Sequence, residues 1–191
     1  MCIRDRFHSF HRVPITVEEL QLKETTGTHQ RVIDMVAHEL ITKERIEEWK
    51  ELPGVAPGVD ISRDIVKLAA IERHKNTGHV GLGFLGKYGL KKGAVATSIG
   101  HDSHNLVIAG VTDEDMVLAG NRVIENGGGL AIALEGKVLA DLPLPIGGLM
   151  ADEPVEVVDE KLEHMKKLSV ELGISEDIDC LLYTSDAADD L

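Results

Sequence analysis

Aromatic side chains and cysteines are scarce in this chain. Of its 191 residues, 3% are aromatic and two are cysteine. So few aromatic rings provide little surface on which the bases of a single-stranded nucleic acid could stack. Cys2 and Cys180 lie near opposite ends of the sequence and form no Cys-x-x-Cys pair. We therefore expect neither a disulfide framework nor a cysteine zinc site, and we expect a cytoplasmic protein.

Long apolar runs and a surplus of basic charge are also absent. No apolar segment approaches the ~20 residues that a membrane-spanning helix needs, and the first residues do not form a signal peptide. The chain has 33 acidic and 20 basic side chains, which gives a net charge of -13. These features argue against a basic nucleic-acid-binding surface and against a membrane partner.

The two ends of the chain differ in character from the residues between them. Residues 1–6 and 180–191 resemble translated sequencing-adapter sequence, so neither is expected to take part in the fold. We predict an artefactual or partial N-terminal end over residues 1–12, one domain over residues 13–179, and an artefactual tail over residues 180–191. On this interpretation the chain is a fragment of a longer protein.

Short apolar segments predict the strands of a sheet. β-branched and small apolar residues predict strands over residues 31–37, 94–99 and 106–109. Residues 130–134 and 138–142 are separated by a Glu-Gly turn and predict a hairpin.

Helix signals occur at three places. Thr42 is placed to cap a short helix that runs to Trp49. Thr112 is followed by three acidic residues, which predicts a helix N-terminus, and glycines over 127–129 predict its end. Pro154 suits the first turn of a last helix. The apolar stripe of that helix consists of Val158, Leu162, Met165, Leu168 and Leu172.

Two further segments bear on the fold class. Residues 64–74 fit a strand or a short helix, and we favour the strand. Residues 76–93 contain six glycines, which permit close backbone packing but weaken any regular element. Strands, helix, hairpin and helix follow one another without strict βαβ alternation. This order predicts an α+β fold, with a mixed or antiparallel sheet of short strands packed with two or three helices.

The polar run at residues 101–105 (His-Asp-Ser-His-Asn) is the main candidate site. It lies between two predicted strands and concentrates four functional residue types in five positions. Asp102 can orient the imidazole of His101 or His104, which fixes the tautomer and raises the basicity of the ring. This pairing suits general-base catalysis or the support of a metal ligand. The alternative is a polar turn that satisfies its own hydrogen bonds.

Residues 72–74 (Glu-Arg-His) are a second and weaker candidate. Arg73 could bind an anion, and Glu72 or His74 could reach a ligand, but a solvated strand end is the favoured interpretation. The glycine-rich residues 78–93 lack the spacing of a phosphate-binding loop, so close packing explains them better.

Several stretches together resemble a known family. They are residues 71–74, 81–84, 93–105 (Gly-Ala-Val-Ala-Thr-Ser-Ile-Gly-His-Asp-Ser-His-Asn), 110–116, the glycines at 127–129, and 142–150 (Leu-Pro-Leu-Pro-Ile-Gly-Gly-Leu-Met). In this order and spacing they resemble the C-terminal domain of bacterial and archaeal adenine deaminases, which belong to the amidohydrolase superfamily. The resemblance covers about residues 13–179.

The resemblance implies an enzyme in which a metal-bearing (β/α)8 barrel precedes this domain. In such an enzyme metal-activated water converts adenine to hypoxanthine and ammonia, and manganese or iron is the implied metal, bound mainly by the barrel. This chain has no His-x-His motif of the kind that opens such a site, and it is too short for a barrel of roughly 250 residues. The fragment alone is therefore expected to be inactive. The intact enzyme is expected to be a homo-oligomer that takes adenine as its small-molecule substrate.

The resemblance also indicates which residues approach the active site of the intact enzyme. The expected lining residues, without assigned roles, are His101, Asp102, His104 and Asn105. Glu72 and His74 are weaker candidates for substrate binding. Two other functions stay open, a non-catalytic structural or oligomerisation domain and a stand-alone domain that binds a metal through the polar run.

Overall fold

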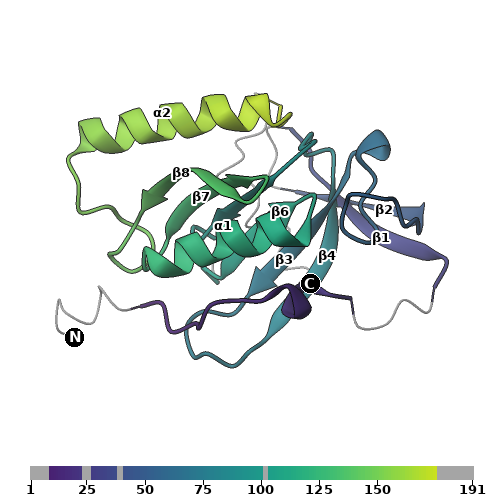
Figure 1. Ribbon diagram of the computed structural model, residues 1–191, viewed down its shortest axis with the longest axis horizontal. Coiled ribbons are helices and arrows are strands. Elements are labelled where there is room, and N and C mark those ends of the chain that lie inside the picture. The colour runs from purple at the N-terminus through teal and green to yellow at the C-terminus, as the bar shows by residue number, and fades with distance from the viewer. Residues whose placement is uncertain (1–8, 23–26, 38–40, 101–102, 176–191) are drawn as a thin grey trace.

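A mixed sheet of eight strands forms the centre of the computed structural model, with a helix on each face (Figure 1). The structure describes residues 9–22, 27–37, 41–100 and 103–175. The strands are β1 (His29–Asp34), β2 (Lys43–Glu48), β3 (Ile65–Ile71), β4 (Val80–Gly86), β5 (Ala94–Thr97), β6 (Leu106–Gly110), β7 (Gly129–Leu134) and β8 (Lys137–Pro143). Within these residues the α-helices are α1 (Asp113–Glu125) and α2 (Val155–Glu171), and the 3-10 helices are η2 (Val17–Leu20) and η3 (Ile61–Arg63).

The strands lie in the order β2-β1-β4-β3-β6-β5-β7-β8. Within the described residues β1 and β4 run parallel, and the other neighbouring pairs are antiparallel. The predicted α+β fold with a mixed sheet is therefore confirmed. The strand favoured over residues 64–74 is confirmed as β3, and the predicted hairpin is confirmed as β7 and β8.

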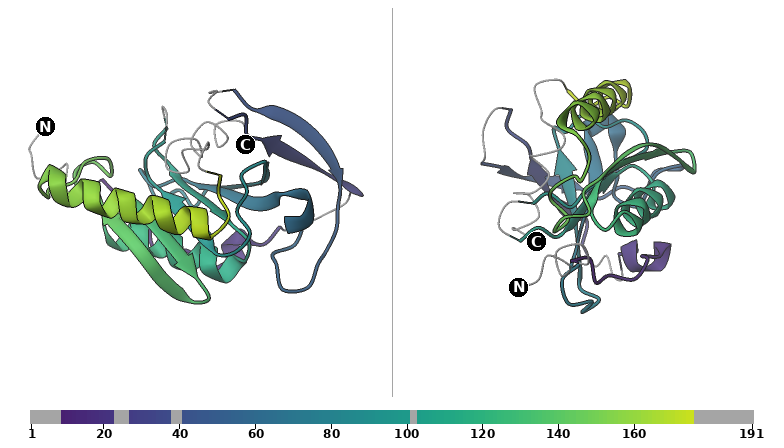
Figure 2. Two further views of the ribbon diagram at one scale, coloured as in Figure 1. Left: turned by 90° about the horizontal axis from the view of Figure 1, so that it is seen from above. Right: turned by 90° about the vertical axis from the view of Figure 1, so that its left-hand side faces the viewer.

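The two faces of the sheet bury different apolar clusters, because successive side chains of a strand point to opposite sides. On one face Met116 and Val123 of α1 pack in a cluster with Ala131 of β7. On the other face Met165 of α2 packs in a cluster with Ile132 of the same strand. Figure 2 shows the two helices on either side of the sheet. The two largest apolar clusters thus lie on opposite faces of the sheet, and a smaller third cluster consists of Val32, Ile65 and Phe84.

Both long helices predicted from the sequence are present. The Thr112 hydroxyl oxygen accepts a hydrogen bond from the Asp115 amide at 3.4 Å, and the helix ends before Gly127. Pro154 is the residue that precedes the first turn of α2 and does not belong to that turn. The predicted stripe of α2 faces the sheet, since all of its members are buried in or packed against one cluster, namely Val158, Leu162, Met165, Leu168 and Leu172. No helix in the described part of the chain is long and apolar enough to span a membrane.

The helix predicted over residues 42–49 is wrong. Lys43–Glu48 form β2, an edge strand paired antiparallel with β1. Lysine, glutamate and arginine favour helices locally, but hydrogen bonding to a neighbouring strand outweighs so weak a preference. The glycine-rich residues 76–93 contain the regular strand β4, which is hydrogen-bonded between β1 and β3. Close packing is confirmed there, because a Cβ atom on Gly86 would lie 2.2 Å from Asp34 Oδ1.

Candidate functional site

Five chain segments meet at one end of the sheet. β3, β5 and β8 end there, while β6 and β7 begin there, because these neighbours are antiparallel. The register places Ile71 opposite Leu106, and Gly129 opposite Pro143. We call these segments the loop cluster, which consists of residues 72–74, 98–100, 103–105, 127–129 and 144–150. The two candidate sites of the sequence therefore lie at the same end of the sheet.

His104 is held in an unusual backbone conformation within the loop cluster. Its φ of 48° lies in the left-handed region, which residues with a side chain rarely adopt. Its Nδ1 atom accepts a hydrogen bond from the Gly100 amide at 3.4 Å. The proton of the neutral ring therefore resides on Nε2. His104 and Asn105 are half-buried, whereas His101 and Asp102 lie outside the described residues and their roles stay predictions.

His74 contacts the same loop from the end of β3. Its Nε2 atom lies 2.8 Å from the main-chain oxygen of Ser103. Since a carbonyl oxygen accepts, the imidazole is the donor in this bond. Arg73 also reaches the loop, because its Nε donates to the main-chain oxygen of His104. The structure thus brings residues 72–74 and 103–105 into direct contact, a pairing that no sequence pattern indicated.

Glu72 organises the turn that follows β3. Its Oε1 accepts hydrogen bonds from the amides of His74 and, at 2.7 Å, Lys75. Its Oε2 accepts from the amide and the hydroxyl of Thr77, each at 2.9 Å. Burial by itself would raise the pKa of Glu72, but these hydrogen bonds, with those of Thr77 and Lys75 foremost, outweigh burial and lower the pKa to about 2. Both carboxylate oxygens are therefore engaged within the domain.

Acid is expected to loosen this turn in a defined pH range. Because the folded-state pKa of Glu72 is depressed, its stabilising contribution is complete above the ordinary value of 4.5 and is lost as the pH falls toward about 2. Hydrogen exchange at Lys75 and Thr77, corrected for intrinsic rates, should accelerate over this range relative to exchange in β3. In Glu72→Gln these amides should exchange fast throughout, without that acceleration. Equal protection in both proteins at every pH would contradict the assignment.

Ser98, Gly128, Gly129 and Gly148 join the remaining segments, and the sequence analysis did not predict their contacts. The buried Ser98 hydroxyl donates to the Gly148 oxygen at 2.6 Å and accepts from the Gly129 amide at 2.7 Å. The backbones of Gly128 and Gly148 touch, since a Cβ atom on Gly128 would lie 2.3 Å from the Gly148 Cα. The sequence does show a hydroxyl residue, Ser98, directly after an apolar strand, but this pattern does not identify Gly129 and Gly148 as its hydrogen-bond partners.

The loop cluster as described does not fit a metal ion. Among the residues that the structure describes, no three His, Cys, Asp or Glu side chains are arranged to hold one. His104 Nδ1 accepts from Gly100, His74 Nε2 donates to Ser103, and Glu72 is engaged in its own turn. The manganese or iron that the family resemblance implies therefore has no ligand set among these residues.

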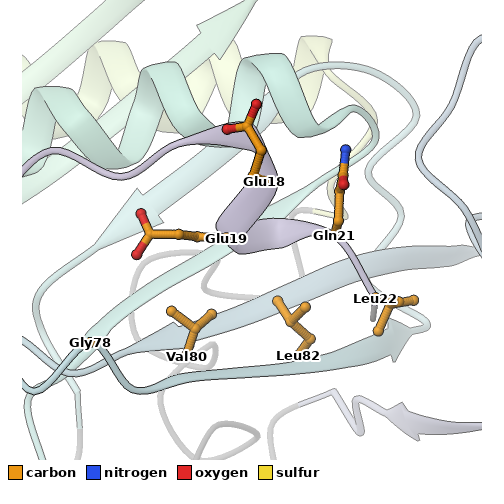
Figure 3. Close-up of a pocket in the computed structure, with 7 residues that line it drawn as sticks. All are labelled: Glu18, Glu19, Gln21, Leu22, Gly78, Val80 and Leu82. Carbon is orange, nitrogen blue, oxygen red and sulfur yellow. The ribbon is translucent and has the colours of Figure 1, made fainter. Parts of the chain in front are cut away.

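A separate open groove lies between η2 and β4 (Figure 3). Its volume is about 530 Å³, and Val80 and Leu82 extend from β4 toward η2, which contributes Glu18 and Glu19. Of the predicted site residues that fall in the described ranges, none lines this groove. The groove is therefore distinct from the loop cluster.

The fold and the loop cluster define an α+β domain that carries its polar loops at one end of a mixed sheet. Residues 39–186 match the family described as Adenine deaminase C-terminal domain, and the chain belongs to this family. The resemblance indicated by the sequence motifs is therefore confirmed.

Full-length relatives extend well beyond the matched segment. The chain is 44% identical over 165 residues to adenine deaminase 2 of Carboxydothermus hydrogenoformans, covering 86% of this chain and 29% of the relative. It is 48% identical over 147 residues to the adenine deaminase of Kosmotoga olearia, covering 77% and 25%. It is 40% identical over 179 residues to the adenine deaminase of Lysinibacillus sphaericus, covering 93% and 30%. The chain thus spans less than a third of the length of these relatives.

Proposed function

We propose that this chain is the C-terminal domain of an adenine deaminase, which hydrolyses adenine to hypoxanthine and ammonia, and that its loop cluster lines the active site of the intact enzyme. The names of the relatives support the reaction. The convergence of the family-like stretches supports the location, because residues 71–74, 98–100, 103–105, 127–129 and 142–150 are far apart in the sequence but reach one end of the sheet.

His104 and Asn105 supply groups that match a purine. Adenine presents ring nitrogens that accept hydrogen bonds and an exocyclic amine that donates them. A carboxamide both donates and accepts, so Asn105 can bind such an edge with two bonds. With Nδ1 of His104 accepting from Gly100, its Nε2–H is the donor that remains for a ring nitrogen. We assign the binding and orientation of adenine to these two residues, with His101 and Asp102 completing the lining.

The remaining chemistry belongs to a barrel domain outside this chain. The resemblance implies manganese or iron there, which would activate the attacking water. On this proposal the 191-residue chain by itself has no deaminase activity. The intact enzyme is proposed to be a cytoplasmic homo-oligomer.

The test uses a full-length adenine deaminase that carries this chain as its C-terminal domain, obtained by recovering the flanking coding sequence. His104→Ala and Asn105→Ala should each lower kcat/KM for adenine by roughly tenfold or more, the worth of a hydrogen bond made in the reacting complex. His164→Ala is the matched control, because this histidine is exposed on α2. The proposal fails if both loop variants keep the parent kcat/KM.

A structural role without contact to substrate is the second candidate. It is favoured by one observation, that Arg73, His74 and Gly100 already engage the main chain or ring of residues 103 and 104 within the domain. On this alternative His104→Ala lowers the melting temperature, while the kcat/KM of the folded enzyme stays at the parent value. The same pair of measurements therefore separates the two functions.

A further inference from the structure

Arg73 is a fully buried cation that has no acidic partner among the residues that the structure describes. Its exposed fraction is 1%, and no ion pair to a described carboxylate involves it. Its guanidinium donates to neutral oxygens instead. Nε donates to the main-chain oxygen of His104, Nη2 to that of Gly147 at 3.0 Å, and Nη1 to the main-chain and hydroxyl oxygens of Ser9 at 3.5 and 3.3 Å. The guanidinium carbon also lies 4.8 Å from the centre of the Phe10 ring.

Burial of a charged side chain is unfavourable, so an arginine at this buried position requires a physical explanation. Desolvation lowers the pKa of Arg73 to about 10, which still leaves the side chain protonated at neutral pH. A guanidinium has donors in a rigid planar fork, so one side chain can bind several separate carbonyl groups at fixed angles. A lysine ammonium presents donors from a single atom and cannot span the same distances. The guanidinium of Arg73 connects three loop segments that are far apart in the sequence, namely residues 9–10, 104 and 147.

The backbone around the guanidinium is shaped to admit it. Gly148 has a φ of +75°, and a Cβ atom there would lie 2.8 Å from Arg73 Nη1. His104, whose main-chain oxygen accepts from Arg73 Nε, has the left-handed φ of 48°. Two hydrogen bonds hold His104 in this conformation, one from Arg73 to its oxygen and one from Gly100 to its ring. Loss of the bond from Arg73 would favour a change in the backbone of His104, because the left-handed region is energetically unfavourable for a residue with a side chain.

We infer that Arg73 is a positioning residue of the deaminase site, which holds the main chain of His104 so that the side chains of His104 and Asn105 keep their places. This inference rests on the proposed function of the loop cluster. Arg73 itself does not touch the substrate, because it is buried beneath the segments it connects. Its effect on the reaction passes through His104, which distinguishes it from a residue that only stabilises the fold.

The experiment is a double-mutant cycle in the full-length enzyme described above. Arg73→Lys keeps the charge but loses the fork, and should lower kcat/KM for adenine by roughly tenfold. In the His104→Ala background the same substitution should have no further effect, because the residue it positions is gone. Asp115→Asn is the stability control. Its carboxylate accepts from the Glu135 and Gly136 amides at 3.2 and 3.0 Å, at the opposite end of the sheet. It should lower the melting temperature and leave kcat/KM unchanged.

Phe10→Leu is the second variant, for the case in which Arg73→Lys does not fold. It removes the ring beside the guanidinium and keeps every donor of Arg73. It should lower kcat/KM by a smaller factor, about two- to fivefold, and again only when His104 is present. Parent kcat/KM in the folded Arg73 and Phe10 variants overturns the inference, as does an equal fall in both backgrounds. A His104→Ala enzyme with parent kcat/KM instead overturns the proposed function.

Discussion

Gly129→Ala is expected to destabilise the domain by roughly 3–5 kcal/mol, the combined cost of backbone strain and overpacking. Gly129 begins β7 with a φ of +128°, which L side chains rarely adopt. A Cβ atom there would lie 2.0 Å from the Leu142 oxygen and 3.0 Å from the Leu144 nitrogen. Both neighbours are backbone atoms, one on β8 and one directly after its end, and the Leu144 amide donates to the Gly128 oxygen at 3.0 Å. The clash therefore has no flexible side chain to relieve it.

Gly136→Ala is the matched control for this prediction. Gly136 also has a positive φ, +75°, but a Cβ atom there would meet nothing within 4 Å. Only the backbone strain remains, so a loss of about 1 kcal/mol is expected. The free energy of unfolding from urea titration measures both. Equal losses at the two glycines would show that contact with Leu142 is not what excludes a side chain at Gly129.

Lys67→Met is expected to destabilise the domain by roughly 3–5 kcal/mol, because it leaves a carboxylate without its cation in a mostly buried place. Lys67 lies on β3 with 1% of its side chain exposed, and its Nζ donates to Asp113 Oδ1 at 2.7 Å. The same Nζ donates to the main-chain oxygen of Leu20. One ammonium thus joins β3, the first residue of α1 and the end of η2. Its removal uncouples the three elements.

The partner variant tests whether the stranded charge is the cause. In Lys67→Met/Asp113→Asn a neutral carboxamide replaces the carboxylate. The double variant should therefore recover a large part of the free energy of unfolding that Lys67→Met loses. Lys166→Met is a surface control, since Lys166 and Glu163 are each 54% exposed and lie 3.2 Å apart. That substitution should cost less than about 1 kcal/mol. Urea unfolding of the four proteins measures the effects. A double variant no more stable than Lys67→Met would refute the stranded-charge explanation.

Local patterns predicted most of the fold, and the failure has a definite cause. Short apolar runs predicted β5 and β6, and two such runs separated by a Glu-Gly turn predicted the β7–β8 hairpin. The strand Lys43–Glu48 was mistaken for a helix, because it is an edge strand whose charged residues have helix propensity. Its pairing with β1 is a non-local contact that no local preference encodes.

The candidate site was predictable in composition but not in assembly. The polar run and the family-like stretches were visible in the sequence, and the family assignment from them is confirmed. The contact between Arg73 and His104 was not visible, because it depends on β3 and β6 being neighbours with Ile71 opposite Leu106. Ser98 likewise has its partners at Gly129 and Gly148, which only the closure of the sheet brings near.

The sequence by itself determined the residue types, the two ends of α1 and the apolar runs of the central strands, because these depend on each residue and its close neighbours along the chain. The tertiary structure decided which main-chain oxygens surround the buried guanidinium of Arg73 and why glycine is required at 129. These depend on distances between segments that are tens of residues apart. A buried polar group must find its partners in space, and strand register sets which partners are within reach.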